Sequence, residues 1–145
     1  MHHGEIVKKC FPGECWTTLP NPDPGHKQAI DKFGLKFVMG KIGEQGLSPQ
    51  TGRITYGGNS GHQAIHLARN LGAAKIILLG YDFHGNGSHW FGEHPQEIRG
   101  GHDYNLWLSS IKHLARDLKN EGIEVINCTP NSAITCFEKR EIQDA

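Results

Sequence analysis

Short apolar runs alternate with helix-spaced apolar positions along most of the chain. Four short segments predict strands: Leu35–Met39, Arg53–Tyr56, Ile76–Leu79 and Ile123–Asn127. The third of these is unbroken in its apolar character, which is typical of a strand covered on both faces. Two longer stretches predict helices, at about residues 60–71 and 104–120. Strands that alternate with helices across short turns predict a parallel sheet with right-handed crossovers.

Both predicted helices carry start signals and a continuous apolar stripe. Asn59 and Ser60 can each cap the first helix, Asp103 can cap the second, and Gly72 is placed as the C-terminal cap of the first. The first stripe, which fits packing on a sheet, is Ala64, Ile65, Leu67, Ala68 and Leu71. The second stripe, predicted to be core, is Leu106, Trp107, Ile111, Leu114, Ala115 and Leu118.

The two ends of the chain lack these patterns. Residues 1–30 are rich in proline and aromatic residues, which predicts an irregular segment that wraps the sheet or reaches a neighbouring subunit. Residues 31–137 form the predicted α/β core, and residues 138–145 a charged tail. The sequence therefore predicts one Rossmann-like, three-layer α/β domain with a short, mainly parallel sheet, truncated on its N-terminal side.

Composition narrows the classes of partner. The 145 residues include 15 basic and 15 acidic side chains, and this balance argues against nucleic acid or an anionic membrane as the main partner. The four cysteines have no CxxC spacing, and no apolar run approaches 18 residues, so we expect reduced thiols in the cytoplasm. So small a sheet leaves its edges uncovered, which predicts a homodimer or a higher homo-oligomer.

The glycine-rich loop Gly57–Gly61 is the leading candidate for ligand chemistry. Its glycines let a ligand approach the backbone, and the first amides of the following helix have no partner within the helix. Such an N-terminus favours a phosphate or a carboxylate. The alternative is a turn that merely starts a buried helix. Ligands of parallel sheets bind beyond the carboxyl ends of the strands, so this loop should meet the segments after Leu79 and Asn127 there.

The loop after the third predicted strand is rich in histidine and aromatic residues. A zinc site could be built from Asp82, His84, His89, His94 and His102, but their spacing follows no metal signature, so neither a metal nor a cofactor is expected. Trp90, Phe91 and Tyr81 either stack on a base or pin the loop to the core. Three arginines suit phosphate, namely Arg53, Arg69 and Arg99, although Arg69 fits a solvated helix position better.

Four motifs occur in order along residues 50–137: GGNSG, ILLGYD, HWFGEHP and NCTPNSAITCF. With them the sequence resembles the second half of the bacterial sialyltransferases of glycosyltransferase family 42. It is closer still to phage and prophage proteins of that superfamily, which also includes pterin diphosphokinase-like members. The resemblance implies that Asn59, Ser60 and Gly61 contact a nucleotide and that Tyr81 and Asp82 lie beside it. It also implies that His94, or else His89, is a general base.

The resemblance also contains a departure. Family members begin with a further strand and a second glycine-rich loop that holds part of the nucleotide, and the present sequence starts after them. We therefore expect binding of a nucleotide-derived anion without turnover, and the resemblance to phage proteins suggests one form of it, a phage protein that sequesters a host nucleotide signal. The alternatives are a metal-independent transferase of CMP-sialic-acid type with His94 as base, and a vestigial domain. The expected ligand-binding residues are Gly58, Asn59, Ser60, Gly61, Tyr81, Asp82, His89, Trp90, His94, Asn131 and Ser132.

Overall fold

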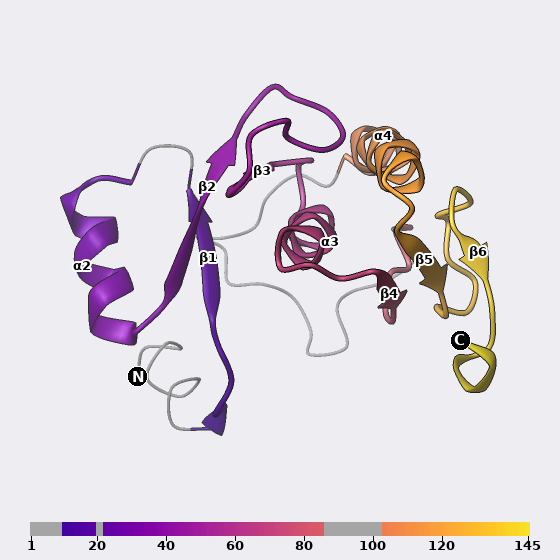
Figure 1. Cartoon of the computed structure of the whole chain (residues 1–145), viewed down its shortest axis with the longest axis horizontal. Coiled ribbons are helices and arrows are strands. Elements are labelled where there is room, and N and C mark those ends of the chain that lie inside the picture. The colour runs from indigo at the N-terminus through magenta and orange to yellow at the C-terminus, as the bar shows by residue number, and fades with distance from the viewer. Residues whose placement is uncertain (1–9, 20–21, 86–102) are drawn as a thin grey trace.

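The computed structural model describes residues 10–19, 22–85 and 103–145 (Figure 1). Its strands are β1 (Trp16–Leu19), β2 (Lys36–Lys41), β3 (Arg53–Thr55), β4 (Lys75–Leu78), β5 (Glu124–Asn127) and β6 (Glu138–Lys139). Its helices are α2 (Pro24–Phe33), α3 (Ser60–Asn70), α4 (Tyr104–Asn120) and the short 3-10 helix η2 (Ile142–Asp144). Within the described residues, no helix has the length and apolar character needed to cross a membrane.

The chain has the expected α/β class with parallel strands, consistent with a small Rossmann-like domain. Its described strands are divided between two sheets, in the orders β1-β2-β3 and β4-β5-β6, and every pair within them is parallel. Helix α3 connects β3 of the first sheet to β4 of the second, and it lies between the two sheets in Figure 1. One continuous sheet would have required β3 to pair with a further strand at its outer edge.

Side chains of α3 occupy that outer edge of β3. The Thr55 amide donates to His66 Nδ1 at 3.1 Å, and Asn70 Nδ2 donates to the Arg53 carbonyl at 2.9 Å. His66 and Asn70 are one helical turn apart, so they face the same strand. These are backbone groups that a neighbouring strand would otherwise bond. Helix α3 therefore ends the first sheet at β3 and protects its edge from pairing with another chain.

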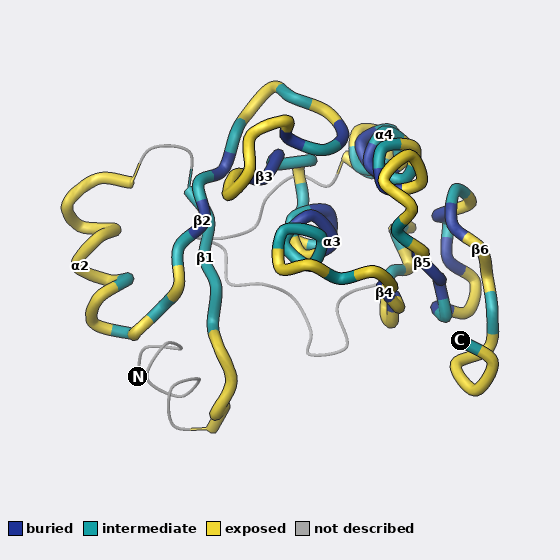
Figure 2. The backbone as a smooth tube through the Cα atoms, viewed as in Figure 1, coloured by how far each residue is buried: buried dark blue, intermediate teal, exposed yellow. Residues whose placement is uncertain are grey.

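The core lies between α3, α4 and the second sheet, where Figure 2 shows buried segments in both helices and in β5. Its buried members are Ile65, Ile76, Leu78, Ile111, Leu114, Leu118, Val125, Ile134 and Phe137. The predicted stripe of α4 is confirmed at its centre, but Leu106 is 48% exposed, so its assignment to the core is wrong. Leu106 lies in the first turn of α4, outside the part of the helix that packs on the sheet.

Among the described residues, strand β4 is covered on one face only. Ile76 and Leu78 are buried, whereas Ile77 is 44% and Leu79 56% exposed, so the prediction of a strand covered on both faces is wrong. The physical reason is position: β4 is an edge strand of its sheet, and in the described part of the chain the helices α3 and α4 cover the side of Ile76 and Leu78. Consecutive apolar residues do not reveal how many layers surround a strand.

Helix α3 starts and ends as predicted but buries a different face. Asn59 caps it, since its Oδ1 accepts from the His62 amide at 2.8 Å, and Gly72 follows the last turn with φ +90°. The fully buried residues are His62, Ile65 and His66. Of the predicted apolar stripe, Ala64 and Leu71 are exposed. Two of the three buried side chains of α3 are therefore polar.

The N-terminal segment is more regular than its composition suggests. Within the stretch predicted to be irregular, residues 16–19 form the edge strand β1, and α2 begins at Pro24. Asp23 caps α2 through a bond from the His26 amide at 2.9 Å, and proline is suited to the first helical position. The prolines of this segment lie next to an edge strand and at the start of a helix, and both positions tolerate a missing amide hydrogen.

Candidate functional site

Tyr81, just after β4, joins the three segments that were expected to meet at the carboxyl edge of the second sheet. Its hydroxyl donates to the Gly61 carbonyl at 3.2 Å, in the first turn of α3. Its amide donates to Thr129 Oγ1 at 2.9 Å, and its carbonyl accepts from Ser132 Oγ at 2.5 Å. Burial raises the pKa of the Tyr81 phenol, which keeps the hydroxyl protonated as a donor.

The turn after β5 is held by its own side chains. Asn127 is buried, its Oδ1 accepts from the Thr129 amide at 3.0 Å, and its Nδ2 donates to Ser132 Oγ at 2.9 Å. The same Ser132 oxygen accepts from the Ile134 amide at 3.2 Å. Ser132 was expected to bind ligand, but its hydroxyl instead bonds to the protein and holds the turn in place. The exposed residues of the turn are Pro130 and Asn131, and Asn131 has φ +56°.

Ser132→Ala is expected to lower the free energy of unfolding by about 2 kcal/mol, because it leaves buried polar partners unsatisfied. Those partners are the Asn127 side-chain amide and the Tyr81 carbonyl. Urea denaturation of both proteins measures the difference. Thr135→Ala, an exposed substitution three residues further on, is the control and should change little. A loss below about 0.5 kcal/mol would contradict this assignment of Ser132.

The glycine loop presents backbone rather than side chains. Asn59 uses Oδ1 for the cap, and its Nδ2 donates to the Gly57 carbonyl at 3.1 Å. The next two amides, of Ser60 and Gly61, have no protein partner within the described part of the chain. Gly61 also permits close contact with the ring of Tyr81, since an added Cβ would lie 2.9 Å from its Cε1. This helix start can therefore offer two free amides and the positive end of a helix dipole.

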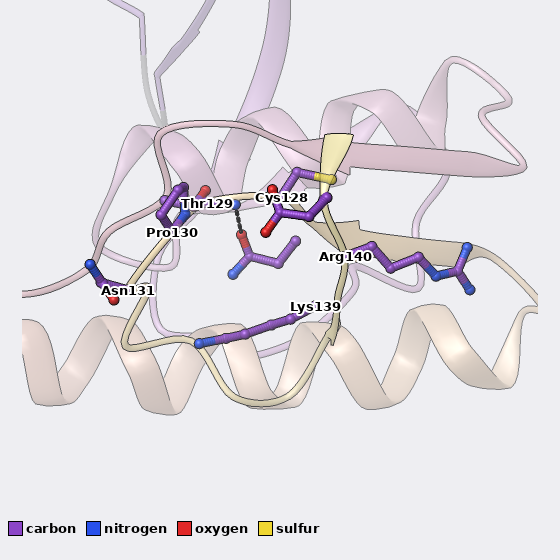
Figure 3. A pocket seen from close by; sticks show the side chains of 8 residues that line it. Cys128, Thr129, Pro130, Asn131, Lys139 and Arg140 are labelled. Atoms are coloured by element: carbon purple, nitrogen blue, oxygen red, sulfur yellow. Dashed lines mark hydrogen bonds between the residues drawn. The ribbon is translucent and has the colours of Figure 1, made fainter. Parts of the chain in front are cut away.

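A cavity of about 480 Å³ opens beside the turn at the carboxyl ends of β5 and β6 (Figure 3). Its lining residues are Asn127, Cys128, Thr129, Pro130, Asn131, Lys139, Arg140 and Glu141. In Figure 3, the side chains of Lys139 and Arg140 extend in opposite directions. Lys139 reaches the turn, where its Nζ donates to the Ser132 carbonyl at 2.8 Å.

Arg140 is already paired on the side away from the turn. Its Nε and a terminal nitrogen donate to Glu138 at 2.7 and 2.9 Å, and its guanidinium lies 3.4 Å from Glu124. Lys139 is therefore the basic residue of this cavity that is available to an anion, since two ammonium hydrogens remain after the bond to Ser132. Sequence reasoning missed Lys139 because it assigned residues 138–145 to a tail. The lysine-arginine pair directly after Glu138 was the available signal.

The other predicted residues divide into three groups. Gly58 and Asp82 lie at the described edge, where Gly58 approaches the Trp107 ring and Asp82 is exposed. Arg69 does not reach the edge, because it forms a two-point ion pair with Glu121 at 2.7 and 2.5 Å. Further candidates lie outside the described residues, namely His89, Trp90, Phe91, His94, Arg99 and His102. Among the described residues, no group of three or more His, Cys, Asp or Glu side chains is placed to hold a metal.

No protein-family model matches the chain, and no match occurs among the curated proteins or the solved structures. The resemblance to family 42 sialyltransferases and to their phage relatives therefore remains a prediction from four sequence motifs. What the chain binds has to be argued from its own geometry.

Proposed function

We propose that the chain binds a nucleotide-derived anionic small molecule at the carboxyl edge of the β4–β6 sheet, without turnover. The observation that supports this most is the joining of three segments by Tyr81, which bonds to Gly61, Thr129 and Ser132. Ligands of parallel α/β sheets bind beyond this edge. The glycine loop, the end of β4 and the turn after β5 are joined there through Tyr81, as the shared direction of parallel strands predicts.

Two features of this edge suit such a ligand: the start of α3 suits its phosphate, and the cavity beside the turn suits the rest of the molecule. The amides of Ser60 and Gly61 at the start of α3, which have no partner among the described residues, suit a phosphate, because a helix N-terminus attracts negative charge. The cavity of about 480 Å³ falls in the size range usual for small-molecule sites, and Lys139 supplies it with a cation. Ser132 links the two features, bonded to Tyr81 through its hydroxyl and to Lys139 through its carbonyl.

The described polar side chains at this edge hold backbone in place. Asn59, Thr129 and Ser132 all bond to the protein itself, so they hold backbone in place. Tyr81 is kept protonated by burial. None of these four is a nucleophile paired with a base in the way covalent or acid-base catalysis requires. We further propose that the chain is a phage protein that sequesters a nucleotide signal in the cytoplasm of a host cell. We expect it to act as a homodimer or a higher homo-oligomer.

The direct test is to release whatever the purified protein holds. The protein is denatured, with and without prior incubation with a panel of nucleotides, and the supernatant is analysed by chromatography and mass spectrometry. Recovery of an intact nucleotide in stoichiometric amount supports binding without turnover. An altered nucleotide supports the transferase alternative, and an empty supernatant across the panel rejects a nucleotide ligand.

Ser60→Asp separates the role of the α3 start in binding from its role in folding. A carboxylate in the first turn of a helix should raise the free energy of unfolding by about 0.5 kcal/mol. The same carboxylate should repel a bound phosphate and raise the Kd of the recovered nucleotide about tenfold. Calorimetric titration measures the second effect and urea denaturation the first.

The matched control for charge is Gln28→Glu, which adds one negative charge at an exposed position of α2, in the unit of β1–β3. It should leave the Kd unchanged within twofold. If Ser60→Asp also leaves the Kd unchanged, the phosphate does not bind at the start of α3.

A further inference from the structure

Two histidines of α3, His62 and His66, are fully buried, and the His62 ring lies against Gly57 of the glycine loop. Thr55 Oγ1 donates to the Gly46 carbonyl at 2.6 Å and lies 2.8 Å from His62 Nε2. Since a hydroxyl has one hydrogen, Thr55 must accept from His62 Nε2–H. His62 Nδ1 is then free to accept from Ser110 Oγ at 3.2 Å. This pattern assigns a neutral ring with its proton on Nε2.

His66 faces two backbone amides. The Thr55 amide points at its Nδ1 at 3.1 Å, and the Ser48 amide at its Nε2 at 3.3 Å. A neutral imidazole can accept at one of these nitrogens, whereas an imidazolium carries hydrogen on both and accepts at neither. The neutral ring thus satisfies one of the two amides, whereas protonation of His66 would set an N–H group against both of them inside the protein. The surroundings of this ring therefore favour its neutral form.

The partners of the two rings hold the loop between β2 and β3, residues 42–52, on α3 and α4. Gly46 and Ser48 belong to this loop, and both are buried. The Leu47 amide adds a bond to Asp117 Oδ2 of α4 at 2.9 Å. By contrast, Ile42, Gln45, Pro49 and Gln50 are exposed. The attachment of this loop is therefore mainly polar, with Leu47 as its apolar contact with the core.

The charges near the rings do not compensate for their burial. Loss of hydration, with a smaller contribution of the same sign from the neighbouring His66, lowers the pKa of His62 to about 4. Burial is also the main cause that lowers the pKa of His66 to about 4, with Arg69 lowering it and Glu121 raising it. Arg69 and Glu121 are paired with each other, so their influences on the ring oppose one another. Asp117 is the further ionisable group of α4 that contacts the loop.

We propose that His62 and His66 form an acid-operated latch, which releases residues 42–52 from α3 and α4 before the core opens. Protonation of His66 removes the one ring nitrogen that accepts a backbone amide, so that the Ser48 and Thr55 amides both face an N–H group. Protonation of His62 keeps its Nε2–H bond to Thr55 but places a charge on a fully buried ring. The core residues Ile111 and Leu114 make their contacts with the second sheet and do not depend on these bonds. The inference concerns the loop attachment and stands whether or not the chain binds a nucleotide.

Amide hydrogen exchange of the full chain between pH 7.5 and pH 4.5 tests this latch. The reporters are the amides of Leu47, Ser48 and Thr55, and those of Ile111 and Leu114 represent the core. Below about pH 6.5, the protection factors of the reporters should fall about tenfold per pH unit for each histidine that opening exposes. Core protection should fall less. Constant protection of the reporters, or an equal fall in reporters and core, would overturn the proposal.

His66→Gln removes one titrating ring, and His113→Gln is the matched control. His113 lies on α4, where its Nδ1 bonds to the Ser109 carbonyl at 2.9 Å, outside the latch. The first variant should lose about one factor of ten per pH unit from the slope of reporter protection, and the control should keep the slope of the parent chain. A full slope in His66→Gln counts against the latch. If His66→Gln does not fold, the comparison of reporters and core in the parent chain decides alone.

Discussion

Gly57→Ala is expected to lower the free energy of unfolding by about 3 kcal/mol, the sum of a backbone and a packing cost. Gly57 has φ +56°, a conformation that costs a residue with a side chain about 1 kcal/mol. An added Cβ would also lie well inside van der Waals distance of the His62 ring. That ring cannot turn aside without losing its bonds to Thr55 and Ser110. Overpacking of such a site costs about 2 kcal/mol.

Gly72→Ala is the control for the backbone cost alone. Gly72 has φ +90°, and an added Cβ there would meet nothing within 4 Å. Its replacement should therefore cost only about 1 kcal/mol. Urea denaturation at pH 7.5 measures both variants against the parent chain. Equal losses at the two glycines would contradict the rigid seat of the His62 ring against Gly57 of the glycine loop.

Local signals predicted α3 and α4 well, although α2 was missed in the segment predicted to be irregular. Asn59 and Asp103 cap α3 and α4 as expected, with bonds of 2.8 and 2.9 Å to the amides of His62 and Leu106. Caps and turns depend on residues within a few positions of each other, so one sequence contains all the partners. The meeting of the glycine loop, Tyr81 and the turn after β5 was also predictable, because it follows from the direction of parallel strands.

Non-local contacts account for the differences between the predicted and the observed fold. The sequence pattern treats histidine as polar and assigns it to a surface, yet His66 is buried because amides of the β2–β3 loop and of β3 bond to it. Those partners are 18 and 11 residues away, and no periodicity records them. The same ring occupies the outer edge of β3. The sequence analysis therefore missed the buried histidines and expected one continuous sheet for the same reason, namely that the bonds between His66 and β3 are non-local.

In the candidate site, the roles of individual residues differ from those predicted from the sequence. Motif order identified Asn59 and Ser132 as ligand contacts, but both use their side chains to hold the backbone. Lys139 was missed, although it reaches the same turn from β6. A motif marks where polar residues gather. Which of them remain available to a ligand depends on bonds that only the folded chain reveals.

Acidification from pH 7.5 to pH 5 is expected to destabilise the protein by about 2 kcal/mol for each of His62 and His66. Both pKa values are about 4 in the folded chain and near 6.5 when the ring is in water. Between these values the unfolded chain binds more protons than the folded chain, so the free energy of unfolding falls as pH falls. The contribution is fully present above about pH 6.5 and is lost as pH approaches 4.

Urea denaturation of the parent chain, His66→Gln and His113→Gln at the two pH values isolates this effect. His66→Gln should be less stable than the parent at pH 7.5 but should lose only about half as much on acidification, because one buried ring still titrates. His113→Gln should respond to pH like the parent. A parent chain equally stable at both values would mean that the two rings already carry a proton or reach water. Either outcome would remove the reason for a neutral ring between the Ser48 and Thr55 amides.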